Sequence, residues 1–269
     1  LYKLFFQNNM QRKVVKHGPS TLTISLPFKW CKENLINEGD LLNIKENDDS
    51  IIIQLDKTTS TKKIKLDLSG FDKLSERIIS AYYKEGYDEF DITFETANEL
   101  KSILNVINKT FIGLEIIEQS HNHIKIKTLA KIDASEFKNI FRKIFYQLLN
   151  IIDESYDAID TKNKNKTQSL IMLDNNINRF TDYCKRLISR NLVPLKNNGL
   201  YHYIIVEQLE TIGDQYKDIN KHVLKNDLIF SNELKQTFND VNKFFRQFND
   251  LYYNFELEKM KVFWKKRNE

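Results

Sequence analysis

The spacing of apolar residues changes along the chain, from alternation in short runs to helical spacing in the second half. In residues 12–53, the alternating runs predict two strands, a short helix and two further strands. Gly18 favours a turn between the first two strands, because glycine tolerates a positive φ. Pro27 ends the second strand and suits the first turn of a helix over 28–34. This first segment, which we bound at 10–56, is therefore predicted to form two β-hairpins around one short helix.

Residues 62–132 predict a small α/β domain in the order β-α-β-α-β-β. Ile64 and Leu66 alternate with polar residues as in a half-buried strand, and helical spacing follows. Thr96 and Glu99 stand three residues apart before an apolar run, which is the pattern of a helix capping box. This order of elements predicts one small sheet covered by two helices.

From Ser135 onward, the apolar residues keep helical spacing, and Ser135 and Ser231 stand where helix N-caps are expected. Long amphipathic helices joined by short loops are typical of an antiparallel bundle, which we expect over 135–269. The predicted fold class is therefore an α+β multidomain protein with segments 10–56, 62–132 and 135–269. The apolar residues of the four expected helices fall within 137–159, 170–188, 201–223 and 234–255.

Composition argues against three classes of protein, namely membrane-spanning proteins, disulfide-stabilised proteins and enzymes. Of 269 residues, 41% are hydrophobic and 29% are charged, and no apolar run is long enough to span a membrane. Cys31 and Cys184 are too few for a disulfide framework, which favours the reducing cytoplasm. No activated nucleophile, glycine-rich phosphate loop or acid–base pair is recognisable, so we do not expect an enzyme.

Charge is strongly polarised in the first segment, although the whole chain carries only +4. Residues 1–32 hold six basic side chains and no acidic one, whereas residues 33–56 hold seven acidic side chains and one lysine. The segment is also close to the length of about 40 residues below which a domain usually needs disulfides, metal or oligomerisation. We therefore expect it to pair with a second copy, which doubles a basic edge suited to phosphate backbones.

The residues Leu26-Pro27 and Trp30, followed by Gly39-Asp40, resemble the AbrB-type swapped-hairpin domain. In that family, two β-β-α-β-β halves interlock into a dimeric barrel that binds double-stranded DNA. The resemblance implies a homodimer; the alternative is a hairpin that only dimerises. Arg12 is the best candidate for reading a guanine, because its guanidinium can bind that base bidentately. The DNA-binding candidates are Arg12, Lys13, Lys16, His17, Lys29 and Lys32.

Acidic residues recur four apart in the helical segment, at Asp153/Asp157 and Glu210/Asp214 and, with an amide, at Asp174/Asn178. Residues four apart share one face of a helix. Carboxylates from neighbouring helices can supply hard oxygen ligands to a divalent or trivalent cation such as Mg²⁺, Mn²⁺, iron or zinc. The alternative is a solvated acidic face.

Two segments on consecutive expected helices resemble PhoU domains, which regulate phosphate uptake and carry metal clusters. They are Asp174-Asn175-Asn176-Ile177-Asn178 and Leu209-Glu210-Thr211-Ile212-Gly213-Asp214. The resemblance implies Asp174, Glu210 and Asp214 as metal ligands, while Asp153 and Asp157 match only the general motif. Thr211 replaces the usual arginine, and a second three-helix repeat is absent.

The three segments together resemble archaeal phosphate-uptake regulators of the PhoU type. This implies a cytoplasmic, dimeric DNA-binding transcription regulator whose helical part senses a signal or binds a partner. The alternative is a regulator that docks on a phosphate transporter or a sensor kinase without binding DNA. The operator, the signal, the metal and any assembly beyond a dimer stay open, as does the role of residues 1–9.

Overall fold

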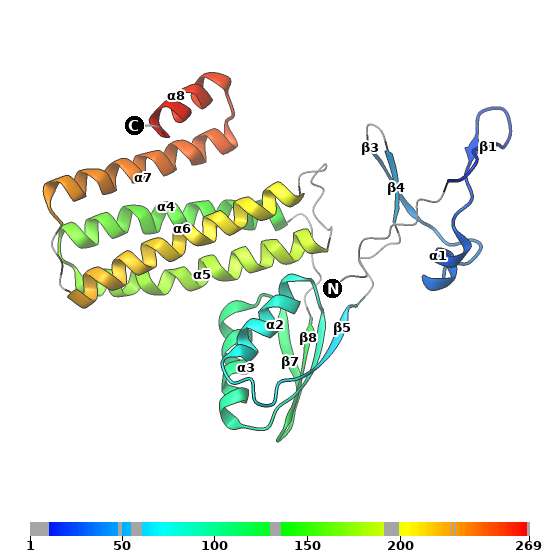
Figure 1. Ribbon diagram of the computed structural model, residues 1–269, viewed down its shortest axis with the longest axis horizontal. Helices are drawn as coiled ribbons and strands as arrows, with labels where there is room; N and C mark the ends of the chain where they lie inside the picture. The colour runs from blue at the N-terminus through cyan, green and yellow to red at the C-terminus, as the bar shows by residue number, and fades with distance from the viewer. Residues whose placement is uncertain are drawn as a thin grey trace. The chain divides into compact units, whose positions relative to one another are not determined.

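The computed structural model describes residues 11–47, 50–54, 61–129, 136–190, 199–226, 228 and 230–267. The protein is mixed α and β, with small sheets followed by a helical region (Figure 1). It divides into two compact units, Leu1–Lys57 and Thr58–Glu269. The segments that the sequence separates as 62–132 and 135–269 thus fall within one unit. The Ser135 cap lies outside the described residues.

The N-terminal unit contains two separate two-stranded sheets and one short helix. Strand β1 pairs antiparallel with β2, with Val15 opposite Thr23. Strand β3 pairs antiparallel with β4 over five residue pairs. Gly18 lies between β1 and β2 with φ +79°, as the predicted turn requires. The elements are β1 (Val15–Lys16), β2 (Leu22–Thr23), α1 (Phe28–Glu33), β3 (Asn43–Asn47) and β4 (Ser50–Gln54).

The second unit begins with a four-stranded sheet in the order β5-β6-β8-β7, which carries helices α2 and α3 on one face (Figure 1). Strand β6 pairs parallel with β5 and antiparallel with β8. This is the predicted β-α-β-α-β-β order. The elements are β5 (Lys63–Asp67), α2 (Leu74–Lys84), β6 (Glu89–Thr93), α3 (Ala97–Thr110), β7 (Leu114–Gln119) and β8 (His123–Thr128).

The predicted capping box starts α3. Glu99 N–H donates to Thr96 Oγ1 at 3.2 Å, and the Glu99 carboxylate accepts from the backbone N–H groups of Thr96 and Glu95. The same carboxylate accepts the N–H of Gly70 at 2.5 Å, which ties the loop after β5 to α3. These backbone donors hold the pKa of Glu99 below its usual value. Glu99 is therefore both a helix cap and a loop tie.

Three long helices, α4, α5 and α6, pack against one another along their lengths (Figure 1). Helix α7 packs on α4 and is capped at its N-terminus by Ser231, whose hydroxyl accepts the N–H of Leu234. Helix α5 starts at Lys164 and is capped by the Asn163 side chain. The bounds are α4 (Glu136–Asp160), α5 (Lys164–Ser189), α6 (Gly199–Asn226), α7 (Asn232–Tyr253) and α8 (Leu257–Arg267). None of the helices in the described ranges is long and apolar enough to cross a membrane.

The C-terminal end of α5 is fastened to the sheet by two arginines. The Arg186 guanidinium is 1% exposed and donates to Asp88 Oδ1 at 2.6 Å and to the Tyr83 carbonyl at 2.9 Å. Arg190 pairs with the other oxygen of Asp88 and donates to the Gly86 carbonyl at 2.8 Å. The Arg186 guanidinium also stacks over the Tyr83 ring, 4.8 Å from its centroid. The sheet and the helices therefore share a buried, charged joint.

Candidate functional site

The basic residues with described side chains in the N-terminal unit all lie on its surface. Lys16 belongs to β1, and His17 follows in the turn, where its N–H donates to the Thr21 carbonyl at 2.8 Å. Lys29 and Lys32 lie three residues apart on α1 and so share a face of that helix. Lys29 is 3.9 Å from Glu33, an exposed pair that contributes little to stability. All six predicted DNA-binding residues have exposed side chains, namely Arg12, Lys13, Lys16, His17, Lys29 and Lys32.

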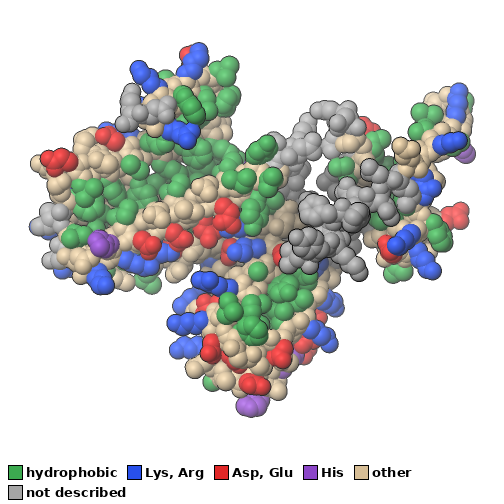
Figure 2. Space-filling view, in the orientation of Figure 1, with side chains coloured by type: hydrophobic (Ala, Val, Ile, Leu, Met, Phe, Trp, Pro, Cys, Tyr) green, Lys and Arg blue, Asp and Glu red, His purple; other side chains and the backbone are tan. Residues whose placement is uncertain are grey.

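The same unit exposes its apolar residues. No residue with a described side chain between 11 and 53 is buried. Leu41 is 94% exposed and Leu22 is 70% exposed, and Ile44 and Ile51 of the second hairpin are 63% and 65% exposed. Burying one such side chain is worth about 1.5–3 kcal/mol, which the isolated unit does not gain. Its described surface therefore combines cationic side chains with uncovered apolar ones (Figure 2).

The predicted metal ligands lie on α5 and α6, and a lysine separates two of them. Lys217 Nζ donates to Asp174 Oδ2 at 2.8 Å and also to Asp214 Oδ1, one turn earlier on α6. Asp174 is 2% exposed, and Asn178 donates to its Oδ2 at 3.1 Å. Burial raises the pKa of the Asp174 carboxyl, and the bond from Lys217 opposes that shift.

Glu210, the third predicted ligand, pairs with a different lysine. Lys185 of α5 is 1% exposed, and its Nζ lies 2.6 Å from Glu210 Oε2 and 2.8 Å from Glu207 Oε1. Burial lowers the pKa of Lys185, but bonds to Glu207 and Glu210 outweigh it and raise the net value. Thr181 also donates to Glu210, at 2.9 Å. Glu210 is thus held by cationic and hydroxyl donors of α5.

Asp182 adjoins this second group and lies near helix α2. Its Oδ1 lies 3.8 Å from Lys84 Nζ of α2 and 4.0 Å from Lys185 Nζ. Burial raises the pKa of Asp182 to about 6, with Lys84 opposing the shift and Glu210 adding to it. This carboxyl is therefore poised to change its charge near neutral pH.

The weaker metal candidates are also paired with cations. Asp153 contacts Arg246 of α7, and Asp157 Oδ2 lies 2.5 Å from Lys166 Nζ. Among the described residues, no three His, Cys, Asp or Glu side chains come together as a metal site. The donors present therefore do not fit a multinuclear cluster, and metal binding stays a prediction.

The residues that sequence reasoning missed are the lysines. Lys217 follows Asp214 by three positions, a helical spacing that signals a contact but is common by chance. Lys185 stands among Cys184, Arg186 and Leu187 on an α5 stretch that is buried on all sides. A buried lysine requires a charged partner, so its place in an otherwise apolar helical pattern is the available signal.

An apolar groove runs between α6 and α7. Its volume is about 360 Å³, and hydrophobic side chains gather there on the surface (Figure 2). The α8 residue Phe263 contributes to the lining and stacks on Phe244 of α7, with ring centroids 4.3 Å apart. The remaining lining includes Ile205, Leu209 and Phe248. A groove of this size and polarity suits an apolar group rather than a metal or phosphate.

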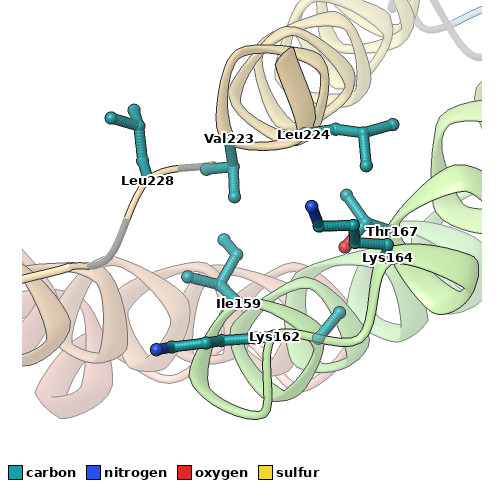
Figure 3. A pocket seen from close by; sticks show the side chains of 8 residues that line it. Ile159, Lys162, Lys164, Thr167, Val223, Leu224 and Leu228 are labelled. Carbon is teal, nitrogen blue, oxygen red and sulfur yellow. The ribbon is translucent and has the colours of Figure 1, made fainter. Parts of the chain in front are cut away.

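A smaller pocket lies where α4 turns into α5 beside the end of α6. Figure 3 shows Ile159 and Val223 facing each other across it, while Lys162 points away. Its volume is about 60 Å³, which accommodates a few water molecules. This pocket is too small to be the main ligand site of the helices.

Comparison with protein-family models, with curated proteins and with solved structures finds no match to this chain.

Proposed function

We propose that the protein is a dimeric, DNA-binding transcription regulator whose helical region senses a signal or binds a partner. The observation that carries this proposal is the N-terminal surface, where six exposed basic residues accompany uncovered apolar side chains. Pairing with a second copy as a swapped-hairpin barrel covers the apolar side chains and doubles the cationic surface. Such a surface binds phosphate backbones, and the guanidinium of Arg12 binds a guanine base bidentately.

The link to phosphate uptake comes from the resemblance of the α5 and α6 segments to PhoU domains. Two features support a regulatory rather than catalytic role for this region. Its carboxylates are paired with lysines and arginines, and its groove between α6 and α7 is apolar. The joint from Arg186 and Arg190 to Asp88 connects this region to the sheet.

A gel-shift titration of the full chain tests DNA binding. A labelled duplex from its own upstream region and a random duplex of equal length are titrated at several salt concentrations. Neutralising Z phosphates gives a slope of about −0.9Z for log K against log salt. The R12E/K13E variant is expected to lose most of the affinity and, as a dimer, to reduce the slope by about two to four units. The proposal of DNA binding is refuted if the gel shift of the duplexes does not depend on salt concentration, or if no shift occurs at micromolar protein.

K101E/K109E is the matched control, because it makes the same charge change on exposed positions of α3. It is expected to bind the duplexes nearly as the wild type does. Equal losses in both variants would show that net charge, and not the N-terminal surface, drives retention.

A second candidate function is docking on a phosphate transporter or sensor kinase without DNA contact. The apolar groove between α6 and α7 favours it, because a protein partner can fill such a surface. Charge reversal at Arg12 and Lys13 leaves this function intact, so the same variant separates the two candidates.

A further inference from the structure

We propose that Lys217 is a built-in counter-ion, whose ammonium neutralises Asp174 and Asp214 where a bound cation would otherwise be required. Lys217 Nζ bonds to carboxylate oxygens on two helices, Asp174 on α5 and Asp214 on α6. It therefore does what a bridging metal ion does between helices, using a group that belongs to the chain. This inference is independent of DNA binding.

The surroundings of Asp174 point to a cation at this place. Its Oδ1 is buried and has no hydrogen-bond partner among the described residues, and the same holds for Asn178 Oδ1. Gly213 of α6 lies against this carboxylate, since a Cβ there would stand 3.4 Å from Asp174 Oδ1 and 3.2 Å from Ile177 Cδ1. Buried acceptors without donors are costly, and they favour a positive charge nearby. The ammonium of Lys217 thus bonds to one oxygen each of Asp174 and Asp214, next to two buried oxygens that lack a donor.

A second lysine–carboxylate pair joins the same two helices, with the lysine on α5 and the carboxylate on α6. Lys217 extends from α6 to a carboxylate of α5, while Lys185 extends from α5 to Glu210 of α6. Both contacts fit one antiparallel register of α5 and α6. Asp174 lies opposite Lys217 in that register, and Thr181 lies opposite Glu210. The acidic residues that run along α6 (Figure 2) are thus compensated from within the fold.

Removing the ammonium should convert the cluster into a metal site. In K217M the side chain keeps most of its apolar length but loses its charge. Two carboxylates and an amide oxygen then remain, which are ligands that Mn²⁺ and Mg²⁺ accept. The test uses full-length protein stripped with EDTA and then titrated with Mn²⁺ or Mg²⁺. Thermal unfolding and Mn²⁺ electron paramagnetic resonance give two readouts that do not depend on DNA binding.

The wild type is expected to keep its unfolding midpoint after EDTA treatment and to gain little from Mn²⁺. K217M is expected to unfold several degrees lower, to bind Mn²⁺ at least tenfold more tightly than the wild type, and to recover part of its midpoint with the ion. K221M is the matched control one turn on, where Lys221 makes an exposed pair with Asp218, and it should change neither readout.

The double variant D174N/K217M covers the case in which K217M does not fold. It removes the uncompensated charge and is expected to be more stable than K217M without metal. The proposal is overturned if EDTA destabilises the wild type, or if wild type and K217M bind Mn²⁺ equally. It is also overturned if the double variant is no more stable than K217M.

Discussion

Arg186 and Asp88 stand 98 positions apart in the chain and form a buried ion pair of 2.6 Å between the end of α5 and the start of β6. The guanidinium also donates to the Tyr87 carbonyl at 2.5 Å and to Thr128 Oγ1 at 3.2 Å. It therefore satisfies polar groups from α2, from the turn before β6 and from β8 at once.

Replacing Arg186 by methionine should destabilise the protein strongly. Asp88 would keep Arg190 but lose the buried partner of Oδ1, and removing one member of a buried pair typically costs about 3–5 kcal/mol. The free energy of unfolding in urea measures the loss. K65M is the control, because Lys65 is 89% exposed and 3.9 Å from Asp91, and it should cost less than about 1 kcal/mol. Equal costs for the two variants would contradict a structural role for the joint.

Alanine at Gly86 should be more damaging than alanine at Gly70. Both glycines have positive φ, +90° and +79°, so each substitution brings backbone strain of about 1–3 kcal/mol. At Gly86 the added Cβ would also stand 2.4 Å from Arg190 Cγ, whereas at Gly70 no atom lies within 4 Å. The free energy of unfolding, measured in urea, should be lower for G86A than for G70A by at least about 1 kcal/mol. Identical midpoints would show that Arg190 moves aside freely.

Asp182 should make stability depend on pH. Its pKa is about 6 in the fold and near 3.8 when unfolded, so the native state binds more protons between these values. The free energy of unfolding therefore falls as the pH rises from about 4 to 6, by roughly 1–3 kcal/mol from this group. D182N should flatten that part of the profile. This assignment would be refuted if the free energy of unfolding changed with pH in the same way for the wild type and D182N between about pH 4 and 6.

An aspartate at Leu41 should weaken self-association. Leu41 is 94% exposed, so a monomer would tolerate the charge, whereas a dimer that covers this residue would not. Light scattering after size-exclusion chromatography is expected to give a dimer for the wild type and a concentration-dependent shift to monomer for L41D. M172D is the control, since Met172 is 64% exposed on α5 and lies outside the N-terminal unit. A wild type that is monomeric at all concentrations contradicts the dimer.

Local patterns predicted the sheet region well because its signals lie within a few residues. Thr96 and Glu99 identify the start of α3 through a spacing of three, and alternation at Ile64 and Leu66 identifies β5. The break between α7 and α8 was missed, because the apolar spacing continues past Asn254, although that residue leaves helical geometry. The pattern specifies which face is apolar but not where the backbone turns.

The candidate sites were less accessible from sequence. Asp174 and Asp214 do approach one another, as expected for acids on consecutive helices, but Lys217 lies between them. The Arg186 joint could not be foreseen, since its partners Tyr83, Asp88 and Thr128 come from distant segments. Local spacing carries no information about which long-range charges meet.

Helix α5 runs without interruption from Lys164 to Ser189 and carries Asp174 near its middle and Arg186 near its end. These two residues are twelve positions apart, or about 18 Å along the axis. An α-helix resists stretching, because each hydrogen bond fixes the next turn. Helix α5 is therefore a stiff connection, along which a displacement at the Lys217 contact would reach the Arg186 contacts with the sheet.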